Sequence, residues 1–117
     1  KIFCWGIMPE LFVHTKRLPA SRFVASNFLV GKNTYNNYIS ASKKLTLKSW
    51  NFFKKDLMLD LEKNRPRIIV DTSTGNWKNF GFYQVRNYPE LVIFIEKNYS
   101  KISVIDKMVI YSYKHKL

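Results

Sequence analysis

The sequence is poor in the residues that build metal sites and disulfides. Its 117 residues include one cysteine, Cys4, and two histidines, His14 and His115. A single thiol excludes a disulfide within the chain, and no pair of ligands has the spacing of a zinc site. Cys4 lies in an apolar run without a basic neighbour, so we interpret it as a buried, unreactive thiol. We therefore expect neither a metal centre nor a cofactor.

Glycine is also scarce, and its distribution argues against a nucleotide-binding loop. The four glycines are not clustered ahead of a helix, as a phosphate-cradling loop requires. The chain has no Gly-x-Ser-x-Gly motif, and His14 falls on a short predicted helix, where a structural role is the better interpretation. The chain therefore lacks a self-sufficient set of catalytic residues. Whether it belongs to a larger enzyme stays open at this point.

Acidic residues are few, and this gives the chain a strong positive charge. Eight Asp and Glu stand against twenty Lys and Arg, for a formal net charge of +12. Such a charge fits surroundings that offer negative charge, such as nucleic acid or anionic lipid headgroups. No predicted helix concentrates the basic residues, and no single-strand binding motif is present. We therefore expect nucleic acid to bind only non-specifically.

Long hydrophobic runs are missing as well. The densest run, 91–95, is followed by Glu96 and Lys97, far short of the roughly eighteen apolar residues that span a bilayer. The hydrophobic share of 46% and the aromatic share of 16% nevertheless exceed those of a disordered tail. We expect one soluble domain over 1–117, which opens on an apolar run as a fragment of a larger protein would. Within it, residues 31–45 show neither helical nor strand period and are predicted to form a mobile crossing.

The hydrophobic pattern alternates between strands and helices. It predicts strands over 2–5, 67–72, 102–105 and 109–113, and helices over 11–17, 47–64 and 89–98. Two of the helices start with the same Pro-Glu-Leu sequence, at Pro9 and Pro89, which suits the first helical turn. This order predicts an α/β fold, a three-layer sandwich with parallel inner strands and an antiparallel C-terminal hairpin.

Two charged residues have both a structural and a functional interpretation. Asp71 ends a predicted inner strand, where open α/β sheets place ligand groups. The favoured interpretation is that it caps the next turn through the backbone amide of Ser73 or Thr74. Arg22 could bind an anion, but the favoured interpretation is an ion pair with Glu10 or Asp71 that fixes the irregular crossing.

The connection 73–86 is unusually aromatic, and its role stays open. Its rings, interleaved with basic residues, could stack on bases or sugars, or they could complete the core. We expect any functional surface at the carboxyl ends of the parallel strands, with this loop beside them. The candidate docking or substrate surface consists of Trp5, Arg22, Asp71, Trp77, Tyr83 and Arg86.

Several motifs occur in an order that points to a known family. They are Ile2-Phe3-Cys4-Trp5-Gly6, Pro9-Glu10-Leu11-Phe12, Leu18-Pro19-Ala20-Ser21-Arg22-Phe23, Asn64 to Asp71, Tyr88-Pro89-Glu90-Leu91 to Tyr99, and the hairpin from Ile102 to Tyr113. In this order they resemble the globular C-terminal region of bacterial membrane glycosyltransferases. These are the dolichyl-phosphate-mannose protein mannosyltransferase-like proteins and their lipid-A-sugar-transferase relatives. The hairpin turn departs from the family, because Lys107 follows Asp106 where a glycine is usual.

The resemblance implies an accessory domain. The parent chain would carry many transmembrane helices upstream and take a sugar from a polyprenyl-phosphate donor at the extracytoplasmic, periplasmic face of the membrane. The family's catalytic acid lies in an early loop between membrane helices, so no catalytic residue is expected here. The implied partners are the transmembrane body of the parent chain and the anionic membrane surface. The alternative is a free-standing basic module that binds nucleic acid or anionic surfaces.

Overall fold

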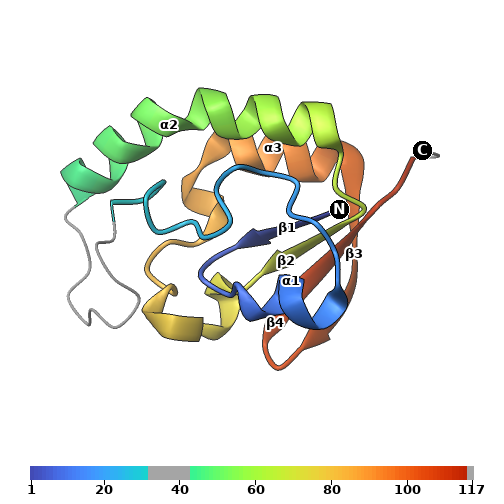
Figure 1. The fold of residues 1–117 in the computed structure, drawn as a ribbon. Coiled ribbons are helices and arrows are strands. Elements are labelled where there is room, and N and C mark those ends of the chain that lie inside the picture. Colours follow the sequence, from blue (N-terminus) through green and yellow to red (C-terminus); the bar gives the residue numbers. More distant parts are fainter. Residues whose placement is uncertain (32–42, 116–117) are drawn as a thin grey trace.

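The computed structural model describes residues 1–31 and 43–115. Within them, four strands form one mixed sheet in the order β1-β2-β4-β3, as Figure 1 shows. The predicted α/β class, the parallel inner pair and the antiparallel hairpin are confirmed. Most of the predicted crossing at 31–45 lies outside the described residues, and its last three residues already belong to helix α2.

The strands bring the two halves of the chain together. β1 (Ile2–Trp5) and β2 (Ile68–Asp71) are parallel, while β3 (Tyr99–Ile105) and β4 (Met108–Tyr113) form the antiparallel hairpin. β4 also pairs with β2 in the antiparallel sense. In this register Trp5 lies beside Asp71, and Asp71 lies beside Val109. The carboxyl ends of β1 and β2 therefore meet at one edge of the sheet.

The helices cover the two faces of the sheet unequally. α2 (Lys43–Asn64) and α3 (Pro89–Asn98) lie together on one face, and the short α1 (Glu10–Thr15) lies on the other (Figure 1). Right-handed connections explain why the helices cover opposite faces. From β1, the chain passes through α1 to a bridge with Pro19 on one side of β1. It then passes through α2 to β2 on the other side of β1, so the second connection covers the opposite face. α1 buries no residue, so the third layer is thin.

The core is aromatic and lies between the sheet and the pair α2 and α3. Trp5 is fully buried and packs its indole against Trp50, Phe80 and Tyr88, with ring centroids 6.0, 5.7 and 5.0 Å away. The indole nitrogen donates a hydrogen bond to the carbonyl oxygen of Tyr83 at 2.7 Å. The aromatic connection after β2 is thus fastened to the centre of the core.

Candidate functional site

The carboxyl ends of β1 and β2 are closed by backbone contacts. The amide and the hydroxyl of Thr72 both donate to the carbonyl oxygen of Trp5, at 3.0 and 2.9 Å. Gly6 follows at φ 136°, and a Cβ there would lie 1.8 Å from the Thr72 hydroxyl oxygen. Ser26 seals the other side, because its amide donates to the carbonyl oxygen of Gly6 at 2.8 Å. Glycine is needed here for close packing, and no room for a ligand remains between the two strand ends.

Asp71 serves mainly as the cap of the turn that follows β2. Its Oδ1 accepts a hydrogen bond from the amide of Ser73 at 2.9 Å and another from the Ser73 hydroxyl. The favoured structural interpretation is therefore confirmed. Burial raises the pKa of the Asp71 carboxyl, and the two Ser73 hydrogen bonds oppose that shift. Among the described residues, Oδ2 of Asp71 receives no hydrogen bond.

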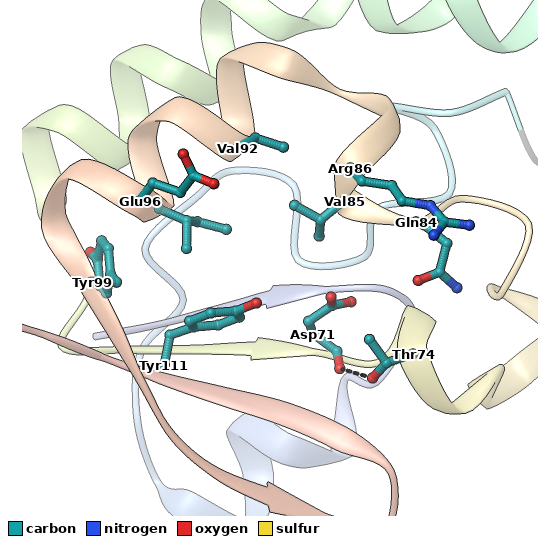
Figure 2. A pocket seen from close by; sticks show the side chains of 10 residues that line it. Asp71, Thr74, Gln84, Val85, Arg86, Val92, Glu96, Tyr99 and Tyr111 are labelled. Atoms are coloured by element: carbon teal, nitrogen blue, oxygen red, sulfur yellow. Dashed lines mark hydrogen bonds between the residues drawn. The ribbon is translucent and has the colours of Figure 1, made fainter.

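Asp71 also borders a cavity of about 390 Å³ between the sheet and α3. Figure 2 shows Asp71 and Tyr111 on the sheet side, with Val92 and Glu96 of α3 above them. The 3-10 turn η3 (Val85–Asn87) forms another wall with Val85 and Arg86. Sheet, turn and helix thus border an open pocket lined by both polar and apolar side chains.

Hydrogen bonds fix several of the residues around this cavity. The Gln84 amide nitrogen donates to the carbonyl oxygens of Ser73 and Gly81, at 2.8 and 2.7 Å. The Tyr99 hydroxyl donates a hydrogen bond to the carbonyl oxygen of Pro66 at 2.6 Å, so only the ring of Tyr99 contributes to the lining of the cavity. Burial, with the charge of Asp71, raises the pKa of Tyr111. The Tyr111 hydroxyl is therefore neutral and available as a hydrogen-bond donor.

Two residues of the predicted surface are core residues instead. Trp5 is 0% exposed and Tyr83 is 1% exposed, so the expectation that they form a docking surface is wrong. Phe80 is buried with Tyr83, whereas Phe82 is 51% exposed, so two of the four rings of the aromatic connection complete the core. Trp77 is half-buried and donates its indole N–H to the carbonyl oxygen of Asp106 at 2.9 Å, which ties the connection to the hairpin turn. Arg86 is exposed at the mouth of the cavity.

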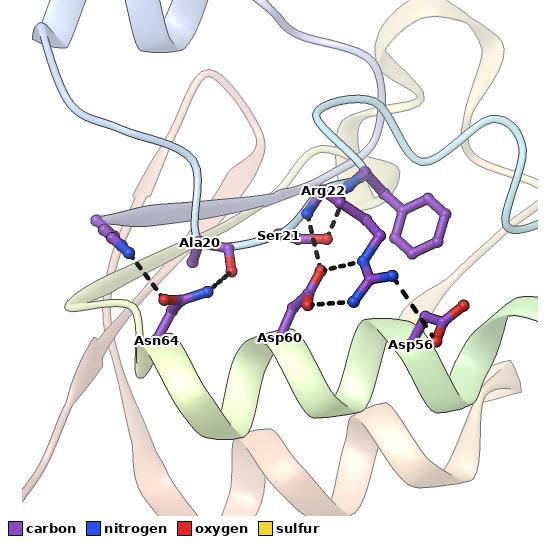
Figure 3. A network of polar contacts seen from close by, with 8 residues as sticks. Ala20, Ser21, Arg22, Asp56, Asp60 and Asn64 are labelled. Atoms are coloured by element: carbon purple, nitrogen blue, oxygen red, sulfur yellow. Dashed lines mark hydrogen bonds and ion pairs between the residues drawn. The ribbon is translucent and has the colours of Figure 1, made fainter.

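Arg22 forms the ion-pair lock that was favoured, but with other partners. Figure 3 shows its guanidinium in a two-pronged pair with Asp60, at 3.0 and 2.9 Å, and near Asp56 at 3.8 Å. The hydrogen bond from Arg22 lowers the pKa of Asp60. Glu10, one of the partners expected for Arg22, pairs with Lys78 at 2.8 Å. Arg22 therefore fixes the segment before the crossing to α2 and does not join the cavity.

The sequence interpretation missed a basic and apolar stripe on the outer face of α2. Phe52 is 77% exposed and Leu59 is 55% exposed. Exposed lysines alternate with them at helical spacing, so all five side chains share one face. We name Lys48, Phe52, Lys55, Leu59 and Lys63 the α2 stripe. The spacing of four, three, four and four residues is the signal that could have found it.

Other sites are not seen within the described part of the chain. No described helix has the length and apolar content to cross a membrane. In the same residues, no group of three or more His, Cys, Asp or Glu could hold a metal ion. Cys4 is buried, and burial raises the pKa of its thiol to about 12, which keeps it protonated.

Comparisons of this chain with protein-family models, curated proteins and solved structures found no match.

Proposed function

We propose that this chain is the accessory, non-catalytic domain of a membrane glycosyltransferase that uses a polyprenyl-phosphate-linked sugar donor. In this role it lies at the extracytoplasmic face and rests on anionic headgroups beside the transmembrane body. The ordered motifs that resemble the family support the assignment to a glycosyltransferase. The observation that carries the membrane contact is the α2 stripe.

The α2 stripe has the composition of a surface that lies in a lipid interface. Two large apolar side chains, Phe52 and Leu59, are more than half exposed to water, although the ring of Phe52 touches that of Phe53 edge-on. At a membrane they would enter the headgroup boundary, while the flanking lysines would reach the phosphates. Exposed apolar residues on one helix face, framed by cations, commonly mark such a contact.

The expected strength of this contact suits a tethered domain. Three lysines near an anionic surface contribute about 1 kcal/mol each, and partial burial of the two apolar side chains adds about 1 kcal/mol each. Glu62 is exposed at the end of the same face and reduces its charge from +3 to +2. Together, these contributions give only weak membrane binding for a protein that is free in solution. Such binding is sufficient for a domain whose covalent attachment keeps it at the membrane.

Co-sedimentation with lipid vesicles tests the membrane contact. We expect the chain to bind vesicles of phosphatidylglycerol and phosphatidylcholine, to bind more weakly as salt rises, and to ignore pure phosphatidylcholine. Phe52→Ser combined with Leu59→Ser should abolish binding. The matched control, Ile102→Ser with Val104→Ser, removes two exposed apolar side chains from β3 and should leave binding unchanged. Equal loss in both double variants, or equal binding to neutral vesicles, would contradict the proposal.

The proposed accessory role also predicts that the chain by itself has no transferase activity. The chain alone should transfer no sugar, because the resemblance assigns the donor site and the catalytic acid to the transmembrane body and not to this domain. Incubation with a polyprenyl-phosphate sugar and detection of released carrier measures this. Turnover by the chain alone would contradict an accessory role.

A further inference from the structure

The cavity beside Asp71 is outside the α2 stripe and has no role in the proposed membrane contact. It measures about 390 Å³ and lies between α3, η3 and the sheet. Its volume falls in the range of small-ligand sites. Residues from β2, β4, η3 and α3 border it, so its shape depends on the whole fold rather than on one loop.

A buried polar group aimed into this cavity gives an independent reason to expect a ligand. Asp71 is only 3% exposed, and Ser73 satisfies just one of its carboxylate oxygens. The other oxygen has no hydrogen-bond donor among the described residues, and the carboxylate borders the cavity (Figure 2). Because this oxygen faces the open cavity, it can accept a hydrogen bond from a molecule that enters and brings a donor.

The other residues that line the cavity determine which chemical groups a ligand must carry. The Tyr111 hydroxyl can donate or accept, and the guanidinium of Arg86 at the mouth donates only. Val85, Val92 and the ring of Tyr99 form an apolar wall. A ligand must therefore offer hydroxyl donors and acceptors together with a face of C–H groups. This combination is that of a sugar ring.

The charges at the cavity disfavour an anion. Asp71 and Glu96 repel negative charge, and the guanidinium of Arg86 at the mouth offsets only one of these two carboxylates. We propose that this cavity binds one neutral monosaccharide unit, with Oδ2 of Asp71 accepting a hydrogen bond from a ring hydroxyl. The choice of a sugar over another polyol rests on the proposed function. The site itself rests on the cavity and on Asp71.

Backbone amide NMR of the chain, titrated with simple sugars, tests this proposal. Mannose, glucose, arabinose and N-acetylglucosamine serve as probes, with inorganic pyrophosphate and spermidine as charged comparisons. We expect saturable shifts with at least one sugar, on the order of millimolar affinity. The shifts should cluster at Thr74, Val85, Arg86 and Val92 and leave the α2 stripe unchanged.

Two neighbouring positions on α3 provide a matched pair of variants. Val92 borders the cavity, whereas Ile93 points to solvent. Val92→Phe should fill the cavity and abolish the shifts, and Ile93→Phe should leave them intact. Asp71→Asn should weaken binding by about tenfold or more, since it removes a charged acceptor. Circular dichroism of each variant verifies the fold.

The outcomes separate this site from the membrane contact. Sugar shifts without vesicle binding would support the site and overturn the membrane contact, and the reverse result would do the opposite. Absence of saturable shifts with every sugar would overturn the site. So would equal effects of Val92→Phe and Ile93→Phe, or tighter binding of pyrophosphate or spermidine than of any sugar.

Discussion

Replacing Trp5 and Trp77 by phenylalanine, one at a time, separates the core from the surface of the aromatic connection. Both indoles donate one hydrogen bond to a backbone carbonyl, Trp5 to Tyr83 at 2.7 Å and Trp77 to Asp106 at 2.9 Å. Trp5 is fully buried, whereas Trp77 is half-buried. The same chemical change is thus made in two environments, which makes Trp77→Phe the control for Trp5→Phe.

The expected difference in the free energy of unfolding follows from those environments. In Trp5→Phe the carbonyl of Tyr83 loses its donor in the core, which costs about 1–3 kcal/mol. The smaller ring leaves a cavity among Trp50, Phe80 and Tyr88, which adds about 1–2 kcal/mol. In Trp77→Phe water can replace the lost partner, so the cost should stay below about 1 kcal/mol.

Urea unfolding followed by far-ultraviolet circular dichroism measures both variants without relying on tryptophan fluorescence. We expect Trp5→Phe to lower the free energy of unfolding by about 2–5 kcal/mol, with a melting temperature lower by roughly 10 °C or more. Trp77→Phe should lie within a few degrees of the unmodified chain. If Trp5→Phe cost no more than Trp77→Phe, the assignment of Trp5 to the core would be refuted.

Three further predictions concern the strand ends, the buried acid and the charge. Gly6→Ala should cost more than about 2 kcal/mol in thermal unfolding, because the new Cβ meets Thr72 at positive φ, and an unchanged melting temperature would contradict this. Burial raises the pKa of Asp71 above 3.8, so the stability contributed by its protonation is present below pH 3.8 and is lost as pH rises through the raised pKa. Asp71→Asn should remove this loss, and a stability difference between the two chains that does not vary with pH would refute it. Binding to DNA, measured by fluorescence anisotropy, should be independent of sequence and fall steeply with salt; selective binding at physiological salt would favour a free-standing nucleic-acid module.

Local signals in the sequence predicted much of the fold. Pro89 begins α3 as expected, and Asp71 caps its own turn, because both features depend on neighbouring residues. α1 ends at Thr15, two residues before the expected end, because Lys16 adopts a left-handed conformation at φ 54°. β3 begins at Tyr99 instead of Ile102, since the chain passes from α3 into the strand without a loop.

The candidate site was harder to predict because it depends on contacts between distant segments. Arg22 meets Asp60 only after α2 packs beside the segment that follows Pro19, a contact no local pattern encodes. Tyr83 lies in a connection that reads as a surface loop in the sequence. Only its contact with Trp5, which is distant in the sequence, reveals that it belongs to the core. Phe52 and Leu59 share a face by spacing alone, but their exposure depends on which face of α2 meets the sheet.

The coding sequence immediately upstream of Lys1 tests the central claim most directly. An accessory domain of a membrane glycosyltransferase requires several hydrophobic spans of about twenty residues in the same reading frame. It also requires an acidic residue in an early loop between them, as the family resemblance implies. Sequencing that region of the transcript should reveal both. A stop codon or an unrelated soluble domain directly upstream would contradict the assignment to a membrane glycosyltransferase.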